Sequence, residues 1–357
     1  MSARKVVPLL VTLAASGLVS LGAQAQSSMA MYGVVDITLG SYQYAGTKGS
    51  ADNERTTKVD GNQMVTSFLG LRGTEDLGGG LKAGFMIETF LRPDTGAAGR
   101  MDTDVFWGRA ANVWLEGGLG KLTVGRQGNL LFGQVVGFNP FVAAFGLSPA
   151  VRLTYGKWGN DRGDSGWSNA VSYSTPKMGG VVLTAQAQAG ESTDKSEGAS
   201  YALGASYSAG PFAIAGAWQS LRSAEAPKAN FAIDQRQTFG LVSASYDAGF
   251  TKFFGQYGQF ENRHFAGAVR IDTIFYQLGV SVPVGASGKV LASYGETKEK
   301  AVEGGTTPKT RHGIFTVGYD HWLSKRTDLY VAVMMDNEKL PNFEKGYSYV
   351  AGVRHAF

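Results

Sequence analysis

The stretch MAMYGVVDITL, Met29–Leu39, alternates between apolar and polar positions along its length. The odd-numbered positions are mostly apolar, whereas Tyr32, Asp36 and Thr38 share the other face. One apolar and one polar face with a period of two residues is typical of a half-buried β-strand. The sequence therefore predicts a strand here, and this strand sets the pattern for most of the chain.

The same alternation returns in fifteen further segments, which brings the predicted strands to roughly sixteen. An even number of strands is what bacterial outer-membrane barrels require. The further segments are Gln63–Glu75, Leu81–Leu91, Asp104–Glu116, Lys121–Gln127, Asn169–Thr175, Val181–Ala189, Ser200–Ser208, Phe212–Arg222, Gln235–Tyr246, Thr251–Glu261, Arg270–Val282, Lys289–Glu299, Arg311–His321, Thr327–Glu338 and Gly346–Phe357.

The connections between these segments alternate in length. Short ones, such as Asp76–Gly80 and Gly117–Gly120, alternate with long polar ones, such as Ala45–Asn62 and Lys300–Thr310. Short turns at one end and long loops at the other indicate an up-and-down transmembrane barrel. About sixteen strands leave an aqueous channel, whereas about eight give an interior filled by side chains. We therefore predict an all-β fold, a 16-stranded antiparallel transmembrane β-barrel.

Composition supports this fold class and excludes others. Hydropathy averages −0.09 although 43% of residues are hydrophobic, as expected if lipid contacts one face of each strand and water the other. The absence of cysteine excludes disulfides and thiolate metal sites. A net charge of +4, with the charges scattered along the chain, is not the footprint of a nucleic-acid-binding protein.

The first residues are predicted to be a secretory signal. Arg4 and Lys5 precede an apolar body, and Ala23-Gln24-Ala25 forms a small-x-small cleavage site. We expect residues 1–25 to be removed and 26–357 to form a single barrel domain.

Residues 128–166, from Gly128 to Gly166, interrupt the strand pattern with apolar patches, glycines, two prolines and a charged end. So long a loop inside a compact fold is usually functional. We predict that it folds into the barrel and narrows the channel.

Several motifs resemble those of the general diffusion porins of Gram-negative bacteria, of the type common in β-proteobacteria. They lie in family order across the mature chain: YGVVD at Tyr32–Asp36, LGLRGTEDLGGGLKAGF at Leu69–Phe85, VGRQ at Val124–Gln127, YSTP at Tyr173–Pro176, SKRT at Ser324–Thr327 and GVRHAF at Gly352–Phe357. The resemblance implies sixteen strands, a homotrimer and a third extracellular loop folded inward. It also implies that Phe357 belongs to the signal read by the outer-membrane barrel assembly machinery. Phe357 has the same strand parity as Tyr347, Tyr349 and Val353, so it is also consistent with an ordinary lipid-facing aromatic residue.

The chain departs from this family at two positions. Phe68 stands where an arginine often precedes the LG[LF][RK]G segment, and Gly166-Trp167-Ser168 occupies a second stretch that commonly contains arginine. Such arginines would support anion selectivity. Strong anion selectivity is therefore not expected from these motifs.

Candidate pore residues follow from strand parity, from the loop and from the motifs. A charge in mid-strand more often faces the lumen, because a lipid-facing Arg or Lys costs about 2–4 kcal/mol at the midplane. Parity places Arg109 and Arg126 with lipid-facing neighbours, so either a bulge turns them inward, as the motif favours, or they lie near an interface. The predicted pore-lining residues are Asp36, Phe68, Arg72, Lys82, Glu88, Arg109, Arg126, Arg152, Lys157, Asp161, Arg162, Asp164 and Arg354.

The predicted function is passive diffusion of small hydrophilic solutes and ions through the outer membrane of a Gram-negative bacterium. The alternative is a substrate-selective channel of the same fold, with Phe68, Phe132, Phe138 and Tyr155 as an aromatic track. The four histidines lack metal-ligand spacing and there is no phosphate-binding loop, so neither a cofactor nor an enzyme is predicted. Expected partners are two further copies of the chain, outer-membrane lipids and lipopolysaccharide.

Overall fold

The computed structural model describes residues 28–156, 160–161, 163–190, 199–222, 235–264, 271–301 and 310–357. The expected signal segment and the predicted pore residues Lys157 and Arg162 lie outside this range. Neither helix found in the described part of the chain is long and apolar enough to cross a membrane.

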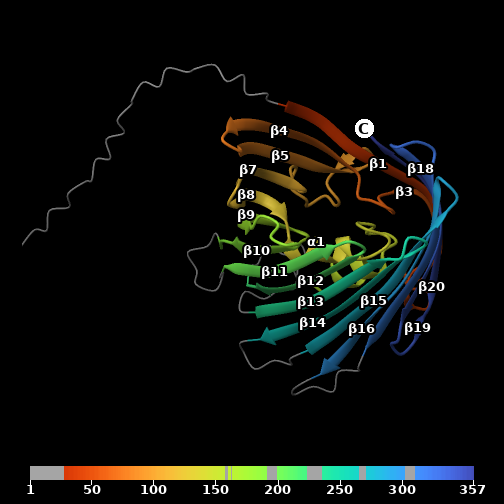
Figure 1. Ribbon diagram of the computed structural model, residues 1–357. Helices are drawn as coiled ribbons and strands as arrows, with labels where there is room; N and C mark the ends of the chain where they lie inside the picture. Colours follow the sequence, from red (N-terminus) through yellow and green to blue (C-terminus); the bar gives the residue numbers. More distant parts are fainter. Residues whose placement is uncertain are drawn as a thin grey trace, which may run out of the picture.

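Sixteen long strands in the described residues form a closed antiparallel barrel, as predicted (Figure 1). Each strand pairs with its neighbour in this series, and the first pairs with the last from Val34↔Ala356 to Ser41↔Tyr349. Closure pairs the edge strands, which is required in hydrocarbon. The strands are β1 (Ser28–Tyr42), β4 (Phe68–Gly78), β5 (Leu81–Arg92), β7 (Ala110–Gly117), β8 (Gly120–Gly128), β9 (Gly166–Ser174), β10 (Val181–Gln188), β11 (Ser200–Ala209), β12 (Phe212–Leu221), β13 (Gln235–Asp247), β14 (Lys252–His264), β15 (Ile271–Val284), β16 (Gly288–Ala301), β17 (Arg311–Trp322), β18 (Thr327–Glu338) and β20 (Gly346–Ala356).

Four short strands complete the sheets. β3 (Thr56–Gly61) pairs with the second half of β1, whereas β4 pairs with the first half. β6 (Ala97–Ala98) pairs with the end of β5. β2 (Gly46–Thr47) and β19 (Phe343–Glu344) pair with each other.

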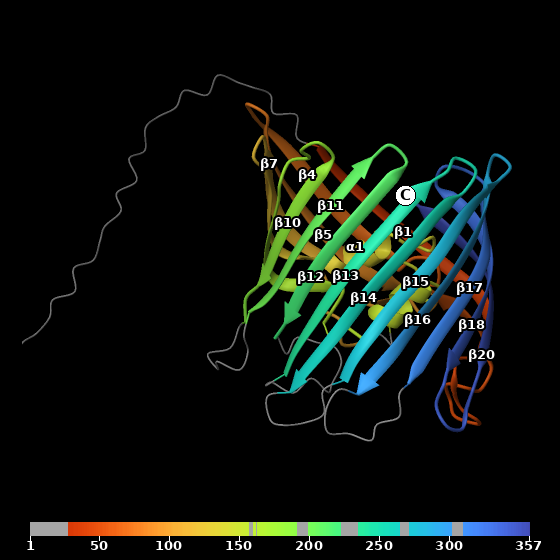
Figure 2. The ribbon, with the colours of Figure 1, turned by 60° about the horizontal axis from the view of Figure 1, so that its bottom comes forward.

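The two ends of the barrel differ in their connections. Figure 2 shows tight turns joining strand pairs such as β11 and β12 at one end. The turn between β4 and β5 depends on glycine, because Gly78, Gly79 and Gly80 all adopt positive φ angles, which cost other residues steric strain. The alternating lengths read from the sequence are thus confirmed.

The outer face of the wall is apolar. Met29, Leu203 and Leu278 are large apolar side chains that remain exposed. Wall residues at the alternate positions face inward, and they include buried polar residues such as Gln186 of β10 and Gln277 of β15. This is the alternation that a barrel in lipid requires.

Most predicted strand boundaries differ slightly from the structure, and two predicted strands begin well before the observed ones. Residues 63–67 precede β4 instead of belonging to it, because Asn62 adopts a φ of +68° and the Asp36 carboxylate accepts the backbone N–H groups of Met64 and Val65. Residues 104–109 likewise precede β7, since Asp104 accepts the backbone N–H of Arg100 within a loop.

Inside the barrel, the described residues between β8 and β9 include two short helices, α1 (Leu130–Gly137) and α2 (Pro149–Thr154), which were not predicted. Both views place α1 within the ring of strands (Figures 1 and 2). The loop packs its apolar residues, such as Leu131 and Leu153, against inward-facing apolar side chains of the wall. Those wall residues are Phe239, Phe260, Phe275, Leu291, Ile314 and Met334. The main apolar core of the molecule therefore lies on one side of the lumen.

Candidate functional site

The inward-folded loop is tied to the wall by side-chain amides. Gln186 of β10 accepts from the Leu130 N–H at 2.9 Å and donates to the Gly128 carbonyl at 2.9 Å. Gln256 of β14 donates to the carbonyls of Val135 and Phe138 at 3.1 and 2.9 Å. These glutamines satisfy backbone groups at both ends of α1, which would otherwise be left unpaired.

The loop itself is internally braced around Asn139. Its side chain donates to the carbonyls of Val135 and Val142 and accepts from the Ser148 hydroxyl. Val142, whose side chain is 55% exposed, adopts a φ of +48°, which is strained for a β-branched residue. The surrounding bonds hold this strained tip in place, as is common at functional positions.

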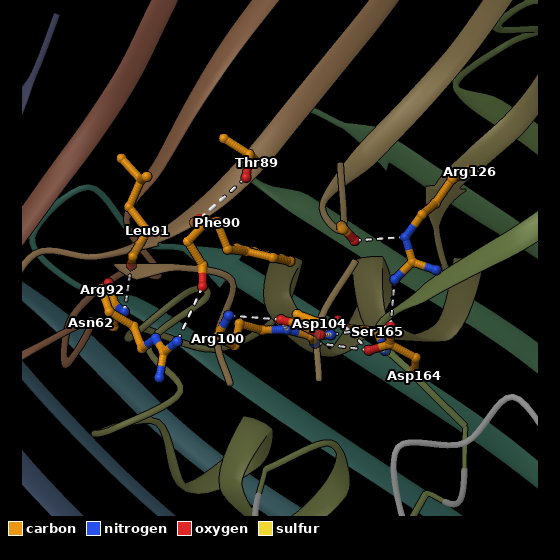
Figure 3. Close-up of polar contacts among 12 residues, drawn as sticks. Asn62, Thr89, Phe90, Leu91, Arg92, Arg100, Asp104, Arg126, Asp164 and Ser165 are labelled. Carbon is orange, nitrogen blue, oxygen red and sulfur yellow. Dashed lines mark hydrogen bonds and ion pairs between the residues drawn. The ribbon is translucent and has the colours of Figure 1, made fainter. Parts of the chain in front are cut away.

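The charged end of the loop is fixed by two arginines. Asp164 pairs with Arg126 of β8 at 2.6 Å and with Arg100 of the β5–β7 loop at 2.8 Å (Figure 3). Arg100 also pairs with Asp104 at 2.8 Å. Burial alone would raise the pKa of the Asp164 carboxyl, but the charges of Arg100 and Arg126 outweigh it and hold the pKa below its usual 3.8.

Arg126 reaches this position through a bulge. The register between β8 and β9 shifts between Gly125 and Gln127, and Gly125 has a φ of +117°. Arg126 then donates to the Gly108 carbonyl at 2.7 Å and to the Ser168 hydroxyl at 2.7 Å. Of the two orientations that the sequence left open for Arg126, the bulged one is present.

A second cluster lies on the inner face of β1, β4 and β5. Glu88 accepts from the Tyr32 hydroxyl at 2.5 Å and pairs with Arg109 at 2.9 Å. The Arg109 guanidinium stands 4.1 Å from the centroid of the Phe68 ring, and Arg72 stands 4.6 Å from that of Tyr32. Arg109 lies just before β7, so strand parity did not apply to it.

The helix α2 contributes Arg152, which is almost fully buried. It approaches Asp336 of β18 at 3.6 Å, donates to the Gly146 carbonyl at 3.3 Å and stacks 4.8 Å from the Tyr44 ring centroid. Asp336 in turn contacts His312 at 2.5 Å. Arg152 therefore links the loop to the wall and to the β1–β3 connection.

Other predicted pore residues lie apart from these clusters. Asp36 is fully buried within the wall, where Tyr330 donates to it at 2.5 Å. Asp161 is a buried residue of the inward-folded loop and accepts from Gln219 of β12 at 2.5 Å. Lys82 is exposed near the tight turn after β4, and Arg354 pairs with Asp328 at 2.9 Å at the same end of the barrel.

The four aromatics of the predicted track do not line a single cavity. Phe132 and Phe138 border a cavity of about 360 Å³ between α1 and β10–β12. Tyr155 is buried against Phe132, with 5.1 Å between ring centroids, and Phe68 lies on β4 under Arg109. Burial, with Asp161 nearby, raises the pKa of the Tyr155 hydroxyl well above 10.0.

A separate cavity of about 330 Å³ lies among three connections at the long-loop end of the wall, and sequence reasoning missed it. The β1–β4 connection contributes Tyr44 and residues 60–63 and 66. The end of β5 contributes Arg92, and the β5–β7 connection contributes Asp94 and Arg100. The inward-folded loop contributes Phe145, Gly146, Arg152 and Gly156. These residues come from three separate segments, so no local pattern in the sequence could group them.

Comparison with known proteins shows which family this chain resembles. Residues 11–340 match the family described as Gram-negative porin. Outer membrane porin protein 32 of Delftia acidovorans is 32% identical over 331 residues, which cover 90% of this chain and 86% of that protein. An outer membrane porin protein of Bordetella pertussis is 26% identical, covering 94% of this chain and 96% of that protein.

A solved structure agrees with this result. The anion-selective porin from Comamonas acidovorans superposes with a TM-score of 0.78 at 26% identity, covering 93% of this chain and 100% of that one. The family match, the relatives and the closed barrel together establish an outer-membrane channel for passive diffusion. The chain belongs to the Gram-negative porin family.

Proposed function

We propose that residues 128–166 form the constriction of this porin and that the constriction is only weakly selective between anions and cations. The observation that supports weak selectivity is the pairing of charges. Each arginine of the two clusters lies beside a carboxylate of the described chain, with Arg72 as the exception, and so do the nearby Arg92 and Arg152. The pairs are Arg92–Asp102, Arg100–Asp104, Arg109–Glu88, Arg126–Asp164 and Arg152–Asp336.

Paired charges leave little net potential for steering ions. An uncompensated cluster of one sign concentrates counter-ions in a cleft, whereas balanced pairs cancel at distances beyond their own separation. Their residual effect is a local field between the positive and negative groups, which orients dipolar solutes. The solved relative is named an anion-selective porin. We propose that this chain differs from it in that property.

The proposal includes the homotrimer and the remaining partners expected from the family: lipopolysaccharide, the barrel assembly machinery, and small hydrophilic solutes and ions as cargo. Residues 1–25 are proposed to be a cleaved signal and 26–357 the barrel domain. A broad exposed apolar groove of about 620 Å³ on β1, β4, β5, β7 and β8, lined by Met29, Val113 and Leu122, supports burial of the outer wall in lipid or against another copy.

The reversal potential under a salt gradient tests the selectivity. The purified porin, reconstituted into a planar bilayer, is expected to give conductance steps in triplets and a reversal potential close to zero. Neutralising Arg72, which has no carboxylate partner among the described residues, by Arg72→Gln is expected to shift the potential toward cation selectivity.

Three outcomes contradict parts of the proposal. A reversal potential that approaches the equilibrium potential of the anion in the unmodified protein would exclude weak selectivity. An unchanged potential in Arg72→Gln would remove Arg72 from the conducting path. Absence of any conductance would contradict the channel itself.

A further inference from the structure

The 330 Å³ cavity among the three connections has lining groups that are not all used within the protein. Such a volume lies near the lower end of the range for small-molecule sites. The cavity is bounded on one side by the inward-folded loop, so it lies beside the proposed constriction and this inference rests on that proposal.

Its positive side is formed by Arg92, Arg100 and Arg152. The Nε groups of Arg92 and Arg152 are buried and have no hydrogen-bond partner among the described residues. The Arg152 side chain is only 9% exposed. Unpaired buried donors are rare because each costs the desolvation of an N–H group, so both guanidinium groups keep hydrogen-bonding capacity that the described residues do not use.

Its negative side is formed by Asp60 and Asp94. Asp60 already pairs with Lys58 at 2.9 Å and accepts the Gly61 N–H. Asp94 is exposed and makes neither a hydrogen bond nor an ion pair within the described part of the chain. The cavity is therefore lined by a free carboxylate and by two guanidinium groups that are each paired on one side and have an unpaired Nε.

The remaining lining is partly aromatic. Phe145 lies on the loop side and Tyr44 on the wall side, where its ring stacks with Arg152. The two segments meet closely here, since a Cβ on Gly146 would stand 2.0 Å from the Gln63 side chain. The cavity thus combines groups of both charges with an apolar surface.

We propose that this cavity binds a small zwitterion with an apolar side chain, the chemistry of an α-amino acid. Its carboxylate would pair with Arg92 and Arg152, its ammonium group with Asp94, and its side chain would contact Phe145. A simple anion satisfies the guanidinium groups but leaves Asp94 facing it with a like charge. The arginines are also already partly neutralised by Asp102 and Asp336, which weakens their hold on a monoanion.

Current blocking by matched solutes tests this assignment in the full-length reconstituted porin. The probes are phenylalanine, its anionic analogue 3-phenylpropanoate, its cationic analogue 2-phenylethylamine, and glycine, which lacks the ring. Phenylalanine is expected to interrupt the current for longer than any of the other three. Equal or longer blocking by 3-phenylpropanoate would overturn the assignment in favour of plain anion binding.

Variants assign the contacts. Arg92→Gln and Asp94→Asn are each expected to shorten the phenylalanine block roughly tenfold, the effect of losing one charge-assisted hydrogen bond. Asp94→Asn should leave the 3-phenylpropanoate block as long as before or longer. Phe145→Ala is expected to shorten the phenylalanine block and to leave glycine unaffected. Lys177→Gln, on the tight turn after β9, is the control and should behave as the unmodified protein.

The result separates this inference from the proposed function. Normal ion conductance without phenylalanine block, or unchanged block in both charge variants, overturns the zwitterion site and leaves the channel intact. Loss of conductance in the unmodified protein would instead contradict the channel. Correct folding of each variant is checked by its unblocked conductance.

Discussion

Phe68 lies on the inner face of β4, 8% exposed, with the Arg109 guanidinium stacked over its ring. The ring shields one side of Arg109, while Glu88 neutralises it from another. Phe68 occupies the position at which the resemblance leads us to expect an arginine, and here its ring packs against Arg109 instead. This face of the wall therefore has one positive side chain fewer than that motif would give.

Replacing Phe68 with arginine is expected to make the channel more anion-selective. At roughly 8 Å in water a unit charge changes the energy of an ion by about 0.5 kcal/mol, so the anion-to-cation permeability ratio should rise by roughly fivefold. Reversal potentials under a salt gradient measure this ratio. Phe250→Arg, in the exposed turn after β13, makes the same substitution outside the lumen and should leave the ratio unchanged. An unchanged ratio in Phe68→Arg would show that position 68 does not face the ion path.

Asp164 predicts a pH dependence of the loop anchor. Its pKa is held below 3.8, so the carboxylate stays ionised between pH 7 and 5. For a depressed pKa, the stabilisation is present above the ordinary value and is lost as the pH falls through the lowered one. Single-channel current should therefore be steady from pH 7 to about 4 and become noisier only below about pH 4.

The variant Asp164→Asn isolates this carboxylate. It leaves Arg100 and Arg126 without their shared partner, so the noise expected at low pH should be present already at neutral pH. Asp247→Asn, in an exposed tight turn, is the matched control. Quiet current at pH 7 in Asp164→Asn would show that the anchor does not control the loop.

At the scale of elements, the inward-folded loop is held by side-chain hydrogen bonds that run both from the loop to the wall strands and from the wall strands to the loop. Gln134 of α1 donates outward to the carbonyls of Ala215 and Leu241, and Gln256 donates inward from β14. Thr316 of β17 donates to the Leu147 carbonyl at 2.8 Å on the far side of the loop. Because these contacts surround the loop, its position is set by the wall on several sides.

Substituting Gln256 with leucine is expected to loosen α1. The change keeps the approximate volume but removes the side-chain donor of the Phe138 carbonyl and one of the two side-chain donors of the Val135 carbonyl, which keeps the bond from Asn139. Each lost bond costs about 1 kcal/mol. Open-channel noise and the frequency of brief closures should rise. Gln259→Leu changes the same residue type on the outward face of the same strand and should have no effect. Equal noise in both variants would contradict anchoring by Gln256.

The strands could be predicted because alternation is a local signal that survives in a single sequence. Thr327–Glu338 was predicted to the residue for this reason. The start of β4 could not be, since the Asp36 carboxylate captures the N–H groups of Met64 and Val65 from another strand. The helices of the loop are too short for a helical period to be recognised. The bulge that turns Arg126 inward depends on pairing with β9.

The sequence predicted several of the charged residues of the candidate site, but it did not predict which residues they contact. Arg109, Arg126, Arg152 and Asp164 were expected near the pore, and the structure places each in an ion pair. Their partners are distant in sequence, as with Arg152 and Asp336, so periodicity does not reveal them. Arg100, which joins two loops through Asp164, had no signal beyond its charge.

At the scale of the whole molecule, the barrel is completed where its last residue meets its first strand. The Phe357 N–H donates to the Gly33 carbonyl at 3.1 Å, and a Cβ on Gly33 would stand 2.6 Å from the Phe357 ring. The ring therefore fits against a position where only glycine leaves room. Phe357 is also 40% exposed on the apolar outer face. It thus contributes to the closing seam and to the apolar outer face. A substitution can separate these roles from the proposed recognition by the assembly machinery.

Phe357→Ala is expected to reduce the amount of folded barrel in the outer membrane, because it removes the aromatic ring proposed to be read by the assembly machinery. Once the same variant is refolded in detergent and reconstituted, its conductance should match that of the unmodified porin, since the backbone pairing of β1 with β20 extends over eight residue pairs and does not depend on the ring. The control is Phe253→Ala on β14, another exposed aromatic near the tight-turn end, which should assemble normally. If both variants assemble equally well, Phe357 is an ordinary lipid-facing aromatic. If Phe357→Ala also fails to refold in detergent, its main role is to seal the barrel against Gly33.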